Sequence, residues 1–69
     1  MVEVFKTNVG ETSEANKLIA LLLQHFPESK INFDLSDCDK ILRVEGKDFM
    51  TEKLVMLVHE NGFNCKVLD

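Results

Sequence analysis

The sequence is poor in several residue types, and each shortage argues against a class of protein. Its 69 residues contain no tryptophan, no tyrosine, one proline and two cysteines, Cys38 and Cys65. Two cysteines so far apart in the sequence fit neither a disulfide-rich secreted scaffold nor a closely spaced zinc-binding pair. We therefore expect free thiols in a reducing compartment, and a cytoplasmic protein.

Long hydrophobic runs are also missing. The longest run, residues 18–23, has six residues, whereas a helix needs about 18–20 apolar residues to cross a membrane. Residues 1–6 show no charged leader followed by an apolar block, so no secretory signal is visible. The sequence predicts no membrane association.

Basic charge is limited as well. Eight lysine and arginine residues against twelve aspartate and glutamate residues give a net charge of −4, and the basic residues are scattered along the chain. Binding to a nucleic-acid backbone needs a basic patch, so we expect no nucleic-acid partner. With 45% hydrophobic and 29% charged residues, the composition is that of one small domain, residues 1–69.

Four segments are rich in strand-forming residues: residues 2–7, 30–35, 41–45 and 63–67. Alternation places these side chains on inner faces: Ile31, Phe33, Leu35, Leu42, Val44, Phe63, Cys65 and Val67. The first strand is ambiguous; we expect Val2 and Val4 to face the core, which leaves Phe5 on the other face. A turn-forming cluster at residues 36–40 joins the middle two strands into a hairpin.

Two segments follow the helical period. Thr12 or Ser13 is expected to cap the first helix, and Pro27 ends it. After a turn at residues 46–48, the second helix is capped near Thr51 and ends at Gly62 in a left-handed conformation. The apolar stripes consist of Ala15, Leu18, Ile19, Leu22 and Phe26 in the first helix and Met50, Leu54, Leu57 and Val58 in the second.

Two helices and four strands, each with one apolar face, predict a two-layer α+β fold. We expect a ferredoxin-like βαββαβ open-faced sandwich, with an antiparallel sheet in the order 4-1-3-2 and both helices on one face. In this arrangement three connections share one end of the molecule: residues 8–11, 37–39 and 59–61.

Over its whole length the chain resembles the heavy-metal-associated domain family, the small copper-chaperone fold. The resemblance rests on residues 31–35, 40–46 and 50–63, the last resembling the family's second helix as it closes on a glycine and an aromatic residue. It implies a metal motif of a methionine and two cysteines at the first loop and helix start. The matching residues, 9–15, contain no cysteine, so no ligand carries over.

The leading hypothesis is therefore a non-catalytic binding or accessory domain on a metal-chaperone scaffold that has lost its thiolate site, without a cofactor. No nucleophile–base pair is visible, so we expect no enzyme activity. An alternative is metal handling at a non-standard site near the first loop, for which His59, Cys65 and Glu11 are the candidates. A second alternative is an ACT-like small-molecule sensor, which would dimerise.

Two further features concern surface residues. The acidic residues Asp34, Asp37 and Asp39 lack the spacing of an EF-hand and predict a solvated turn. Leu21, Val55 and Met56 point wholly or partly away from the inner stripes of their helices. They are candidates for a patch that contacts a protein partner or a second copy of the chain.

Overall fold

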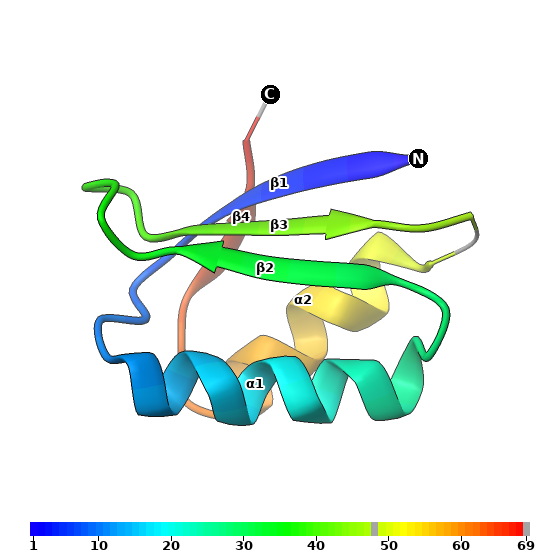
Figure 1. Cartoon of the computed structure of the whole chain (residues 1–69), viewed down its shortest axis with the longest axis horizontal. Coiled ribbons are helices and arrows are strands. Elements are labelled where there is room, and N and C mark those ends of the chain that lie inside the picture. Colours follow the sequence, from blue (N-terminus) through cyan, green and yellow to red (C-terminus); the bar gives the residue numbers. More distant parts are fainter. Residues whose placement is uncertain (48, 69) are drawn as a thin grey trace.

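One antiparallel sheet and two helices make up the two layers of the structure, a computed structural model that describes residues 1–47 and 49–68. Its elements are β1 (Val2–Thr7), α1 (Thr12–His25), β2 (Lys30–Asp34), β3 (Ile41–Glu45), α2 (Thr51–Glu60) and β4 (Cys65–Val67). The strand order is β2-β3-β1-β4, and both helices cover one face of the sheet (Figure 1). This confirms the predicted ferredoxin-like arrangement, since 4-1-3-2 is the same order read from the other edge.

The core lies between the sheet and the helices, where the predicted stripes meet. Leu22 of α1, Leu54 and Val58 of α2, and Leu42 and Val44 of β3 are all 0% exposed. The predicted inward residues of the edge strands also pack into this core, which holds a main cluster and a smaller one beneath the first loop. Clean alternation and helical periodicity therefore gave the correct inner faces for these elements.

Strand β1 is turned the opposite way from our prediction. Phe5 is 0% exposed and lies in the main core, whereas Val2 is 47% exposed. The register explains this, because Phe5 pairs with Leu42 on β3 and Val67 on β4, whose side chains also face the helices. The side of β1 that holds Val2 and Val4 also holds Lys6, which is exposed. Turning the strand over would bury the Lys6 ammonium group, and an unpaired buried charge is costly.

Both helices begin without the side-chain caps that we predicted. Glu11 occupies the N-cap of α1 and Met50 that of α2, and neither side chain makes a capping hydrogen bond. Thr12 and Thr51 are instead the first helical residues, and Ser13 lies within the helix. Both N-cap residues are exposed, so water can reach the amide groups that a side chain would otherwise satisfy.

The two helices have 14 and 10 residues, and no helix in the described part of the chain is long and apolar enough to cross a membrane.

The start of α2 also buries a residue that the sequence analysis missed. Met50, which we placed in the inner stripe, is 66% exposed, whereas Phe49 is 5% exposed and belongs to the main core. A Cβ at Gly46 would lie 3.4 Å from Cδ1 of Phe49, so the ring packs closely against the chain where β3 has just ended. Asp48, which we expected in the turn at residues 46–48, lies outside the described residues.

The end of α2 forms the left-handed cap that the sequence predicted. Gly62 has a φ of 90°, and its N–H donates to the carbonyl of His59 at 3.0 Å. The N–H of Phe63 donates to the carbonyl of Val58 at 3.3 Å. This pair of hydrogen bonds is the Schellman motif, which satisfies carbonyl groups that the helix leaves without partners.

Replacing Gly62 by alanine is expected to destabilise the domain by about 1–2 kcal/mol, because a residue with a Cβ is strained at positive φ. No atom lies within 4 Å of the added Cβ, so the cost comes from the backbone alone. Urea unfolding measures it. Gly10→Ala is the matched control, since Gly10 also has open space around it but no positive φ; equal costs for the two variants would contradict the prediction.

Candidate functional site

Three connections meet at one end of the structure, as predicted. Oδ1 of Asn8, in the first loop, accepts the backbone N–H of Asn64 at 2.7 Å. The N–H of Thr7 donates to the carbonyl of Asp39 at 3.1 Å, and its hydroxyl donates to the carbonyl of Lys40 at 2.6 Å. Thr7, which is 5% exposed, therefore ties the end of β1 to the hairpin between β2 and β3.

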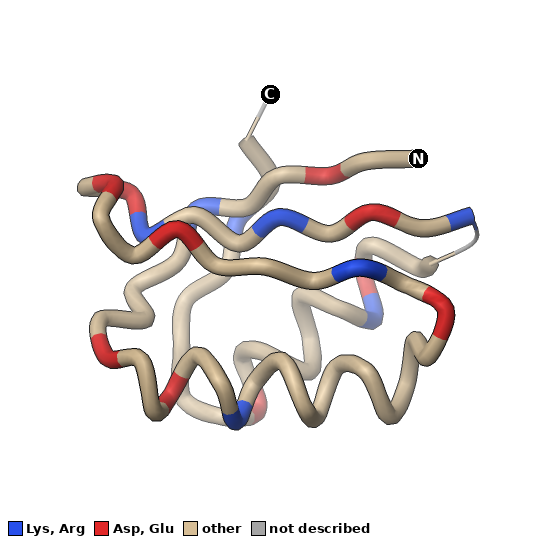
Figure 2. The backbone as a smooth tube through the Cα atoms, viewed as in Figure 1, with Lys and Arg blue, Asp and Glu red and all other residues tan. Residues whose placement is uncertain are grey.

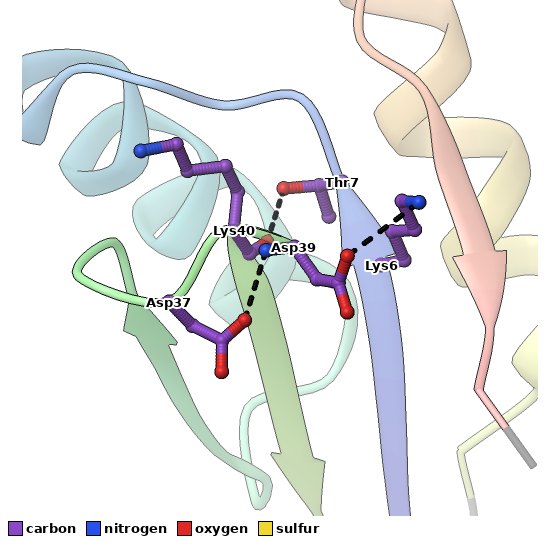
Figure 3. A network of polar contacts seen from close by, with 5 residues as sticks. All are labelled: Lys6, Thr7, Asp37, Asp39 and Lys40. Atoms are coloured by element: carbon purple, nitrogen blue, oxygen red, sulfur yellow. Dashed lines mark hydrogen bonds and ion pairs between the residues drawn. The ribbon is translucent and has the colours of Figure 1, made fainter.

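The hairpin turn is held by its own polar network (Figure 3). Oδ1 of Asp37 accepts the N–H of Asp39 at 2.8 Å, and Oδ1 of Asp39 lies 3.5 Å from Nζ of Lys6. Lys40 has a φ of 46°, a conformation that costs a non-glycine residue about 1 kcal/mol. Hydrogen bonds made by its backbone N–H, its carbonyl and its Nζ offset that cost. The side chains of Asp37 and Asp39 therefore stabilise the hairpin turn.

Replacing Thr7 by valine is expected to destabilise the domain by about 1–3 kcal/mol, because the carbonyl of Lys40 and the N–H of Val9 both lose their hydrogen bond to the hydroxyl group. Thermal or urea unfolding measures the loss, and Thr7→Ser should restore most of it. Thr12→Val is the control on an exposed threonine. A cost no larger than that of the control would contradict the assigned role.

The three candidate metal ligands do not fall in one group of potential ligands among the described residues. Nε2 of His59 accepts the backbone N–H of Cys65 at 3.3 Å, so this nitrogen already holds β4 against α2. Burial raises the pKa of the Cys65 thiol to about 11, which disfavours the thiolate that metals bind. Among the described residues, one group of three or more His, Cys, Asp or Glu side chains is close enough to share an ion: Asp37, Cys38 and Asp39. That group contains none of His59, Cys65 and Glu11.

The three candidates for a partner surface differ in exposure. Met56 is 58% exposed, whereas Leu21 and Val55 are half-buried. Val55 packs against the main core, so much of its side chain is engaged within the domain. Of the three, Met56 alone presents most of its side chain to solvent.

The outer face of the sheet, away from the helices, carries the side chains of β1 that we had predicted to be buried. We call it the outer sheet face. By register it consists of three cross-strand rows: Lys30, Glu45 and Val2; Asn32, Arg43, Val4 and Leu68; Asp34, Ile41, Lys6 and Lys66. Val2 and Leu68 are 47% and 36% exposed, and Val4 and Ile41 are half-buried. Aliphatic side chains thus run through the middle of this face.

Basic residues lie next to these aliphatic side chains, and Arg43 is in the middle row itself. Figure 2 shows that basic positions occur along the strands of the sheet. By register, each of the four strands places one basic residue on the outer sheet face: Lys6 on β1, Lys30 on β2, Arg43 on β3 and Lys66 on β4. By register the described strand residues also place two acidic side chains here, Asp34 and Glu45. The carboxylate of Asp39 lies 3.5 Å from Lys6 at the edge of the face. Four basic against three acidic side chains leave the described residues of this face with a small positive excess, in a protein whose net charge is −4.

The acidic residues of this face are partly engaged within the domain. Oδ1 of Asp34 accepts hydrogen bonds from the hydroxyl of Ser36 at 2.6 Å and from its backbone N–H at 3.2 Å, and the hydroxyl contact is the main cause that lowers the pKa of Asp34. Glu45 lies 3.8 Å from Arg43 on the same strand. Neither carboxylate reaches Lys6 or Lys66 across the sheet, since the ion pairs of the described residues are Lys6–Asp39 and Arg43–Glu45.

A hollow of about 430 Å³ opens where the outer sheet face meets the loop end. Its lining comes from the end of β1, the first loop and β4: Lys6, Thr7, Asn8, Asn64, Lys66 and Leu68. Lys6 and Lys66 are directly opposite each other across the two strands. The hollow is therefore lined by residues that carry two lysine and two asparagine side chains, and Leu68 gives it an aliphatic wall.

The sequence did not reveal the outer sheet face because we predicted that Val2 and Val4 of β1 face the core. The signal in the sequence was Phe5, because burial of this residue places Val2, Val4 and Lys6 together on the outside.

Comparisons of the chain with models of protein families, with curated proteins and with solved structures find no match.

Proposed function

We propose that the domain is a non-catalytic binding module whose outer sheet face docks an acidic segment of a protein partner. One observation carries the proposal: an aliphatic centre that includes Val4 and Ile41 lies among basic residues contributed by all four strands. A partner with a negative rim around an apolar patch complements this arrangement.

The face mixes aliphatic side chains with an arginine on a central strand, and arginine is enriched in protein interfaces. Charged residues steer the encounter and suppress wrong partners more than they add affinity. Val4 has Arg43 opposite it on β3 and Leu68 on β4, so apolar and basic contacts are available at one point of the face. The negative charge of the rest of the protein disfavours docking of an acidic segment elsewhere.

The first loop supports a scaffold without a thiolate site. Val9 is 0% exposed and packs with Ala15 and Leu18 in the smaller core cluster. In the resemblance, residues 9–15 match the metal motif of the heavy-metal-associated family. Here they include the buried side chain of Val9 and contain no soft metal ligand. The scaffold is available for binding through another surface, and the outer sheet face is the one that its charges favour.

Binding through this face is tested by comparing variants of the immobilised protein. Arg43→Glu and Val4→Asp alter the outer sheet face, and Met56→Asp places the same kind of charge on the exposed side of α2. We expect the wild type to capture an acidic protein. Its dissociation constant should rise at least tenfold with Arg43→Glu and stay within twofold of the wild-type value with Met56→Asp. Amide spectra establish that each variant is folded.

Two results would overturn the proposal. One is the absence of any protein that the wild type binds and that Arg43→Glu releases. The other is a partner whose binding depends on Met56 and not on Arg43 or Val4.

Metal handling near the first loop is the competing proposal, and a metal titration separates the two. The reduced protein is titrated with Cu(I), Zn(II) and Ni(II) while backbone amide shifts are followed. We expect no saturable shifts in residues 8–14 and 59–65, because Nε2 of His59 is engaged and the Cys65 thiol is buried. Saturation at micromolar metal with shifts confined to these residues would favour the metal site instead.

A further inference from the structure

Lys6 and Lys66 form a pair that the stability of the sheet does not explain. They are directly opposite each other on β1 and β4, and both side chains are on the exposed outer sheet face. Like charges in this position destabilise an antiparallel pair. Asp39 lies 3.5 Å from Lys6, but both side chains are largely exposed, at 56% and 40%, so the pair is well screened. The ion pairs of the described residues do not include Lys66.

The surroundings of this pair suit an anionic group of limited size. The hollow beside the two lysines holds about 430 Å³, and Asn8 and Asn64 line it from the loop end. Oδ1 of Asn8 accepts the backbone N–H of Asn64, which fixes the position of this side chain while its Nδ2 remains a donor group. Leu68 supplies an aliphatic wall.

We propose that the hollow between Lys6 and Lys66 is a subsite for a carboxylate side chain, glutamate or aspartate, of the docked partner. Two ammonium groups would donate to the carboxylate oxygens in charge-assisted hydrogen bonds. Leu68 would contact the methylene groups that precede the carboxylate. This subsite rests on the proposed function of the outer sheet face, and it fixes where the acidic segment enters: at the β1–β4 corner, next to the first loop.

A peptide of six glutamates serves as the probe, because it carries side-chain carboxylates without any partner-specific sequence. It is titrated into the isotope-labelled protein at low ionic strength, where exposed charges are weakly screened. We expect saturable amide shifts centred on Lys6, Asn8 and Lys66. A peptide of six glutamines should cause none, and inorganic phosphate should bind more weakly at the same residues.

Two lysine variants complete the test. Lys66→Gln is expected to weaken binding of the glutamate peptide about fivefold at low ionic strength, the upper range for an exposed ion pair, and to raise the unfolding midpoint because the like-charge pair is relieved. Lys30→Gln, on the same face at the opposite edge, should leave the affinity within twofold.

The subsite is overturned if the glutamate peptide shifts no residue of this corner, if Lys30→Gln and Lys66→Gln weaken binding equally, or if phosphate binds there more tightly than the peptide. Each of these results can occur while Arg43→Glu still releases the protein partner. The subsite can therefore fail while the proposed function of the outer sheet face stands.

Discussion

Replacing Phe5 by alanine is expected to destabilise the domain by about 3–5 kcal/mol. Phe5 is 0% exposed and pairs with Leu42 and Val67 in the centre of the sheet, so its loss leaves a cavity between the sheet and the helices. A domain of this size has a total stability of only about 5 kcal/mol. The variant should therefore be largely unfolded at 25 °C in low urea, as far-UV circular dichroism and urea titration would record.

Val4→Ala is the matched control for this prediction, because Val4 is the neighbouring residue of β1 and faces outward. We expect it to cost less than about 1 kcal/mol, since its side chain is half-buried on an open surface. A larger cost for Val4→Ala than for Phe5→Ala would mean that β1 faces the helices with its other side. That result would also remove the aliphatic centre of the outer sheet face.

Raising the pH from about 8.5 to 11 is expected to remove about 3 kcal/mol of stability through Cys65. Burial raises the pKa of this thiol to about 11, whereas a thiol in the unfolded chain ionises near pH 8.5. Above pH 8.5 the unfolded state loses the proton and the folded state keeps it. The contribution of the buried thiol is therefore complete below pH 8.5 and is lost as the pH rises to about 11.

The Cys65→Ala variant isolates this effect, because all other titrating groups are shared with the wild type. The difference in unfolding free energy between the two proteins should shrink by about 3 kcal/mol over this pH range. Curves that stay parallel would contradict the assignment. As a second readout, iodoacetamide at pH 8 should modify the exposed Cys38 rapidly and Cys65 only after unfolding.

The fold could be predicted because most elements carry one clear apolar face. The strand at Ile31 and Phe33 and the helix at Leu18 and Leu22 follow a single period, and the structure places their apolar sides inside. Gly62 marked the end of α2 because few other residues adopt positive φ. Local chemistry and tertiary packing agree at these positions.

The prediction was wrong where two local patterns competed. In β1, Val2 and Val4 alternate against Phe5, and the choice depends on pairing with β3 and β4, which no single segment encodes. At the start of α2, Phe49 and Met50 are both apolar, and the backbone before the helix decides which is buried.

The candidate site depended on the first of these choices. With Phe5 inside, Val2, Val4 and Lys6 join residues of β3 and β4 on one surface. The site residues proposed from the sequence were chosen by chemical type. In the structure two of them form a hydrogen bond between α2 and β4, in which the Cys65 backbone N–H donates to Nε2 of His59. Residue type alone does not reveal that His59 Nε2 accepts an amide proton.

Mapping a bound partner by amide shifts tests the outer sheet face most directly. The partner recovered with the wild-type protein is purified and titrated into the isotope-labelled chain. We predict that the largest shifts fall on residues 2–6, 41–45 and 66–68, and that residues 16–24 and 52–60 of the helices shift little. Shifts concentrated on the two helices, with the strands unchanged, would contradict the central claim that the outer sheet face is the binding surface.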